Sequence, residues 1–152
     1  MTTLKLLQLI TLVLRIDNPN LLPAICWVES NHRNVDNMDD GGSPSYGICQ
    51  IKLDTANWMK DKYKIPGKEL EPSDLQKPEI NALYSGLYLL YLTHRYKTLK
   101  CAISAYNAGS CIKSNQNTYV KKVLKKIEAL ESSQIDSKDA SIPKIPVEEK
   151  DA

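Results

Sequence analysis

The segment LLPAICWVES, residues 21–30, decides the fold of this chain. Leu22 and Ile25 are three residues apart and Glu29 follows four residues later, so a helix would place them on one face. Pro23 fits an early turn of such a helix, where its missing N–H costs nothing. Apolar surroundings disfavour a carboxylate anion, so we expect the pKa of Glu29 to be raised. Glu29 is therefore the candidate general acid.

Length and composition predict one domain with a hydrophobic core, because the chain has 152 residues of which 42% are apolar. Residues 1–130 contain 17 Lys and Arg against 12 Asp and Glu, a net charge of +5. Residues 131–152 contain 3 against 6, a net charge of −3. A mildly basic domain suits an anionic partner such as a carboxylate-bearing polysaccharide. The clusters of Arg and Lys typical of nucleic-acid binders are missing, so we expect no nucleic-acid partner.

Hydrophobic periodicity and helix-breaking residues predict a mainly helical chain. The expected helices cover residues 4–14, 21–30, 54–62, 79–96, 101–108 and 118–130, and the fifth stops at Gly109. Residues 31–44 predict a loop or a small hairpin turning at Gly41–Gly42, residues 46–52 a strand-like run, and residues 64–78 a connector. Residues 131–152 contain too little apolar surface to offset the entropy of ordering, so we expect a disordered acidic tail.

The apolar residues 4–14 allow two interpretations. The apolar run behind Lys5 is similar to the core of a signal peptide, but no obvious small-residue cleavage site follows it. Polar residues recur among them at intervals of three or four, which is typical of an amphipathic helix. We therefore expect the first helix of the domain, with a signal peptide as the alternative. The segment is too short and too interrupted for a stable membrane span.

The cysteines suit two disulfides, and their sequence positions leave three connectivities open. No Cys-x-x-Cys spacing occurs and the two histidines are far apart in the chain, so we expect no metal site. The cysteines are Cys26, Cys49, Cys101 and Cys111.

Four short motifs follow one another along the chain: VES at 28–30, SYGICQI at 45–51, AYNAG at 105–109 and TYV at 118–120. In this order they resemble the signatures of the lytic transglycosylase (SLT-type) catalytic domain, which is related to goose-type lysozyme. The resemblance extends through residues 74–86 and covers about residues 5–130. It implies a mainly α, lysozyme-like α+β domain over residues 1–130, with a helical bundle and a small β-hairpin beside the active-site cleft.

The resemblance also implies a role for each matching residue. Glu29 would protonate the β-1,4-glycosidic oxygen between N-acetylmuramic acid (MurNAc) and N-acetylglucosamine (GlcNAc) of peptidoglycan. It would then accept the proton of the muramoyl 6-hydroxyl, which gives a 1,6-anhydroMurNAc end without any cofactor. Gln50, Tyr106 and Asn107 would bind the substrate, with Tyr119 as a weaker candidate. Cys49 and Lys52 depart from the family pattern, which commonly has a methionine and a hydrophobic residue there.

Two other functions stay open. An inverting hydrolase, as in goose-type lysozyme, needs a second carboxylate about 6.5–9.5 Å from the acid, and Asp36, Asp39 or Asp40 could supply it. The domain could instead bind peptidoglycan without cleaving it, as a part of a secretion, conjugation or phage-entry machine. In each case we expect the protein in the periplasm or cell envelope, or in a phage particle.

Overall fold

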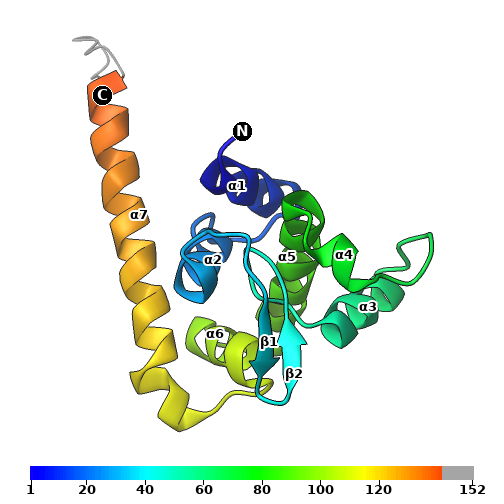
Figure 1. The fold of residues 1–152 in the computed structure, drawn as a ribbon. Helices are drawn as coiled ribbons and strands as arrows, with labels where there is room; N and C mark the ends of the chain where they lie inside the picture. Colours follow the sequence, from blue (N-terminus) through cyan, green and yellow to red (C-terminus); the bar gives the residue numbers. More distant parts are fainter. Residues whose placement is uncertain (142–152) are drawn as a thin grey trace.

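Helices make up most of the architecture, and a small two-stranded hairpin accompanies them (Figure 1). The computed structural model describes residues 1–141, with side chains described as far as residue 134. Its elements in chain order are α1 (Thr3–Val13), α2 (Leu21–Ser30), β1 (Asn37–Asp40), β2 (Ser43–Ser45), α3 (Leu53–Lys62), α4 (Pro72–Leu75), α5 (Pro78–Arg95), α6 (Leu99–Ala108), the 3-10 helix η1 (Lys113–Asn117) and α7 (Tyr119–Ser141). The predicted class, a mainly α lysozyme-like α+β fold, is confirmed.

Helix α5 lies at the centre and separates two parts of the core. It contacts α1, α2, α3, α4 and α6. One apolar cluster joins α5 to α1, α2, α6 and α7, and the other joins it to α3, α4 and the loop after β2. Gly86 allows α1 to approach closely, because an added Cβ would lie 2.8 Å from Leu14 Cδ1 and 2.9 Å from Ile10 Cγ2. The expected first helix is thus an integral part of the domain, and no described helix is both long and apolar enough to cross a membrane.

The hairpin and the segment after it differ in how well they were predicted. Strands β1 and β2 pair antiparallel around Gly41 and Gly42, whose φ angles of 65° and 94° suit glycine, so the predicted turn is confirmed. The predicted strand-like run over residues 46–52 is wrong. It is a tight loop closed by a bridge between Tyr46 and Ile51. Gly47 and Gln50 both have positive φ angles, 75° and 52°, which reverse the chain within four residues.

Helix α7 is longer than predicted. Its expected end at Leu130 is wrong, since the helix continues to Ser141 and runs beside α2 in Figure 1. No Gly or Pro occurs between Tyr119 and Ser141, so nothing in the sequence stops the helix there. Gln134 also exchanges two side-chain hydrogen bonds of 2.8 and 3.3 Å with the buried Asn20. The expected disorder therefore does not apply to residues 131–141, while residues 142–152 lie outside the described part.

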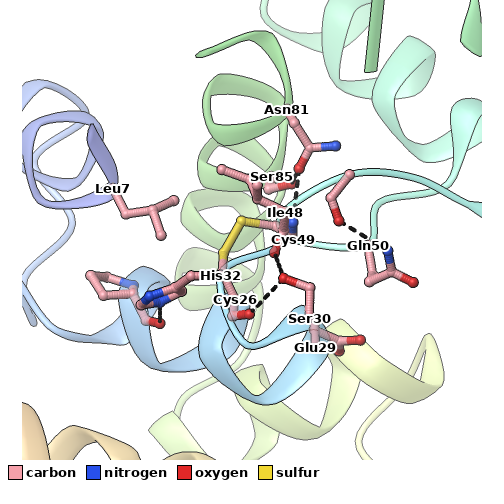
Figure 2. The surroundings of a disulfide bond; sticks show 12 residues. Leu7, Cys26, Glu29, Ser30, His32, Ile48, Cys49, Gln50, Asn81 and Ser85 are labelled. Carbon is pink, nitrogen blue, oxygen red and sulfur yellow. Dashed lines mark hydrogen bonds between the residues drawn. A yellow bond between two sulfur atoms is a disulfide. The ribbon is translucent and has the colours of Figure 1, made fainter. Parts of the chain in front are cut away.

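Two disulfides resolve the pairing that the sequence left open. Cys26 on α2 pairs with Cys49 in the loop after β2, and Cys101 on α6 pairs with Cys111 just beyond that helix. The first bond, drawn in Figure 2, fixes α2 to the loop one turn before Glu29. The second closes the segment that follows α6 back onto its first turn.

The fully buried Asn81 on α5 holds the same loop from the other side. Its Nδ2 donates to the carbonyls of Tyr46 and Leu75 at 2.7 and 2.8 Å, and its Oδ1 accepts from Cys49 N at 3.0 Å. A Cβ at Gly47 would lie 2.3 Å from Asn81 Nδ2, so only glycine fits at that position. One amide thus satisfies three backbone groups that are buried away from water.

We expect Asn81→Leu to lower the free energy of unfolding by at least about 3 kcal/mol, because each of three backbone groups left unpaired costs about 1–3 kcal/mol. Urea denaturation with the disulfides intact measures the change. The matched control is Asn34→Leu, since Asn34 is exposed and its amide makes one hydrogen bond, to Gln76 O. The control should lose less than about 1 kcal/mol. Equal losses in both variants would contradict the role of Asn81.

Candidate functional site

Glu29 lies in the last turn of α2, which ends at Ser30 because Asn31 adopts a left-handed conformation with φ 59°. The carboxyl group is half-buried. Its Oε2 accepts a hydrogen bond of 2.7 Å from the hydroxyl of Tyr119, the first residue of α7. Tyr119 was only a weak candidate in the sequence, yet it is the side chain that contacts Glu29 directly.

Burial dominates the acidity of Glu29. The pKa of the carboxyl group is raised from 4.5 to about 7, mainly because burial disfavours the anion. The hydrogen bond from Tyr119 lowers the pKa and so opposes this effect. The negative charge of Asp40 raises the pKa further. The predicted pKa rise is confirmed, and its cause is the predicted one. Near neutral pH the carboxyl group is populated in both its protonated and its ionised form.

Three contacts fix the loop Tyr46–Ile51 relative to Glu29. The Ser30 hydroxyl donates to Ile48 O at 2.6 Å, and the neighbouring Cys49 carries the disulfide to Cys26 (Figure 2). From α6, the hydroxyl of Tyr106 donates to Cys49 O at 2.8 Å. The departure from the family pattern at Cys49 is thus a covalent link between the loop and α2.

Gln50 uses its side-chain amide inside the protein. Its Nε2 donates to Val35 O at 2.6 Å and to Gly47 O at 2.9 Å, and its Oε1 accepts from the Ser45 hydroxyl at 3.0 Å. Both amide hydrogens are therefore engaged within the chain, and the remaining lone pair of Oε1 is its free hydrogen-bonding capacity. Gln50 lines the hollow beside Glu29, but its described hydrogen bonds connect its own loop to the hairpin and to the segment before it.

Tyr106 and Asn107 on α6 also line this hollow. Tyr106 is buried and its hydroxyl is engaged with Cys49 O, so its ring forms the wall. Asn107 is exposed, and its Oδ1 accepts from Asn115 Nδ2 at 2.9 Å. The ring of Tyr88 lies 5.4 Å from that of Tyr106 and belongs to the same wall. Helical spacing in the sequence could not have identified Tyr88, because it does not separate a core position from a cleft wall.

The three candidate second carboxylates lie in different places. Asp40 lines the hollow with Glu29. Asp36 accepts from Gly47 N at 3.2 Å and from Gln76 Nε2 at 2.6 Å, so its oxygens are engaged elsewhere. Asp39 is exposed and lines neither of the two hollows that reach Glu29. Asp40 is thus the one candidate of the three that shares the hollow with the acid.

Two hollows meet at Glu29. The one with Asp40, Gln50 and Asn107 has a volume of about 360 Å³, and the other, between α2 and the start of α7, has about 420 Å³. Glu29 lines both, so a chain-like ligand could pass across the carboxyl group. Among the side chains described, no group of three His, Cys, Asp or Glu residues could hold a metal ion.

We expect Tyr119→Phe to raise the pKa of Glu29 above its present value of about 7, because the lost hydrogen bond favours the ionised form. The carboxyl group would then stay protonated to higher pH. A pH titration of the ¹³C-labelled glutamate carboxyl signals by NMR measures it. Tyr106→Phe is the control, since its hydroxyl donates to Cys49 O rather than to Glu29. A lower pKa in Tyr119→Phe would contradict this account of the contact.

A comparison with protein families agrees with this geometry. The family model described as the Transglycosylase SLT domain matches residues 15–129, which is most of the chain and includes every site residue above. The comparison with curated proteins gave no match. This protein belongs to the SLT transglycosylase family, the lysozyme-like lytic transglycosylases that cleave glycosidic bonds of peptidoglycan.

Proposed function

We propose that this protein cleaves the β-1,4 bond between MurNAc and GlcNAc and leaves a 1,6-anhydroMurNAc end, with Glu29 as the single acid and base. The observation that carries the proposal is the half-buried carboxyl group of Glu29, with a pKa of about 7 and a hydrogen bond from Tyr119. A general acid works best when its pKa is near the working pH.

Each proton has a place in this reaction. Protonated Glu29 gives its proton to the glycosidic oxygen, the bond to the anomeric carbon breaks, and GlcNAc leaves with a free 4-hydroxyl group. The ionised Glu29 then accepts the proton of the muramoyl 6-hydroxyl as its oxygen bonds to the anomeric carbon. Glu29 ends protonated and no water is consumed. The positioned proton transfer accounts for about 10²–10⁴ of the rate, and the cleft must supply the rest through orientation and charge stabilisation.

Tyr119 supports both halves of this cycle. Its hydrogen bond goes to Oε2 of Glu29, which leaves Oε1 for the substrate. The same bond is stronger when Glu29 is ionised, so it favours the state formed after the first proton transfer. Gln50, Tyr106 and Asn107 would form the opposite wall, with the exposed amide of Asn107 as the group that meets the sugar.

Asp40 favours a second candidate, a hydrolase that yields reducing ends. It lines the hollow with Glu29 and its charge raises the pKa of that group. In such an enzyme Asp40 would deprotonate a water molecule, whose oxygen would replace the leaving sugar at the anomeric carbon. A pure peptidoglycan binder gains nothing from an acid tuned in this way, so binding without cleavage has less support.

The disulfides support a place for the protein outside the reducing cytoplasm. Cys26–Cys49 and Cys101–Cys111 pair all four cysteines of the chain, and such bonds persist in oxidising compartments. We place the enzyme in the periplasm or cell envelope, or in a phage particle, where it meets peptidoglycan strands. A role within a secretion, conjugation or phage-entry assembly fits the same location.

We expect Glu29→Gln to reduce peptidoglycan cleavage by at least about 10²-fold, because the amide cannot transfer the proton. Zymograms and release of soluble muropeptides measure the loss. The matched control is Glu128→Gln on α7, an exposed carboxylate outside both hollows, which should keep full activity. Unchanged cleavage by Glu29→Gln would remove Glu29 from this role.

Mass spectrometry of the products, together with Asp40→Asn, separates the transglycosylase from the hydrolase. The proposed reaction gives muropeptides one water lighter than hydrolytic ones, and Asp40→Asn should still produce them. Because Asp40 raises the pKa of Glu29, the variant should lose activity at a lower pH than the wild type as pH rises. Reducing ends that disappear in Asp40→Asn would instead identify the hydrolase.

A further inference from the structure

The second hollow that Glu29 lines is a basic groove. It lies between the end of α2 and the first turns of α7 and starts at Glu29 itself. We call it the basic groove and define it by Trp27, Arg33, Lys122 and Lys126. Its remaining lining residues include Val28 and Val35, which add apolar surface beside the charges.

The positive charges of the basic groove are not neutralised by the protein. Glu29 is the one acidic residue that lines it. Within the part of the chain whose side chains are described, the one ion pair is Lys77–Asp74, and no carboxylate lies within 4 Å of the groove's cations. Lys122 and Lys126 are four residues apart on one helix, where like charges are destabilising. A bound anion would relieve this repulsion.

Two of the three cations are held in place. The Nζ of Lys126 lies 4.1 Å from the centroid of the Trp27 ring, which is a cation–π contact. The Nε of Arg33 donates to Ser30 O at 3.3 Å. These contacts reduce the entropy that the side chains lose when a ligand binds. Lys122 is exposed at the rim and can reach a ligand in the groove.

The proposed substrate contains acidic groups that fit this groove. Each MurNAc can bear a stem peptide that contains several carboxylates, whereas a MurNAc without a peptide has a single carboxylate, on its lactyl group. We propose that the basic groove binds the carboxylates of a stem peptide next to the scissile bond, so that the enzyme prefers peptide-bearing strands. This inference rests on the proposed function, because it takes the glycan strand to pass Glu29. The apolar surfaces of Trp27 and Val35 would contact the peptide's short alkyl side chains.

The test compares two charge-reversed variants on two substrates. The groove variant is Lys122→Glu with Lys126→Glu, and the matched control is Lys121→Glu with Lys125→Glu, which changes the same charge at exposed positions of the same helix outside the groove. The substrates are peptide-bearing glycan strands and the same strands after an amidase has removed the peptides. We expect the groove variant to lose about tenfold or more in kcat/KM on peptide-bearing strands, mainly through KM, and the effect to shrink at high salt. On bare strands, which keep only the lactyl carboxylate of each MurNAc, its loss should be clearly smaller than on peptide-bearing strands.

Equal losses on both substrates, or no loss on peptide-bearing strands, would overturn the inference. The single Lys122→Gln variant, at an exposed position, repeats the comparison if the double variant does not fold.

Calorimetry on the Glu29→Gln variant measures binding without turnover. It should bind a disaccharide-tetrapeptide more tightly than the bare disaccharide, and the groove substitutions should remove this difference. If the wild type cleaves neither substrate, the proposed function is rejected. The inference about the basic groove is then tested by the binding difference. Binding of a polyglycerol phosphate without binding of the peptide would overturn the inference.

Discussion

The side-chain amide of Asn81, in the first turn of α5, contacts the loop Tyr46–Ile51, and the site depends on this contact. A loop with buried backbone groups needs a partner for each of them, and Asn81 supplies three from one side chain. The close approach leaves no room for a side chain at Gly47. Ser30 and Cys26 then hold the loop against the end of α2, and Tyr106 holds it against α6.

The acid is tuned by two opposing effects that come from different elements. The core around α2 removes water from Glu29 and so favours its neutral form, whereas the Tyr119 hydroxyl at the start of α7 favours the anion. A general acid and base needs both forms to be accessible, and neither effect alone provides this. The helix that carries Tyr119 also carries Lys122 and Lys126, so a single element both tunes the acid and lines the basic groove.

The sequence predicted the features that depend on local chemistry. The turn at Gly41–Gly42, the stop at Gly109 and the raised pKa of Glu29 follow from neighbouring residues. It did not predict features that depend on distant partners. The side chain of Gln50 turned inward because its hydrogen-bond partners come from the hairpin and its own loop, and spacing in the sequence cannot show that. The end of α7 was missed because composition argued for disorder, while Asn20 supplies a partner for Gln134 114 positions away.

Helix α7 contacts both ends of α2 through side-chain hydrogen bonds. Tyr119 contacts Glu29 at the carboxyl end of α2, and Gln134 pairs with Asn20 at the amino end, so the two helices run antiparallel. Sliding α7 along its axis by one residue would move Tyr119 by about 1.5 Å, which is enough to break its hydrogen bond to Glu29. The attachment at Asn20 opposes that slide. The protonation state of Glu29 therefore depends, through the position of α7, on the Asn20–Gln134 pair at the opposite end of α2.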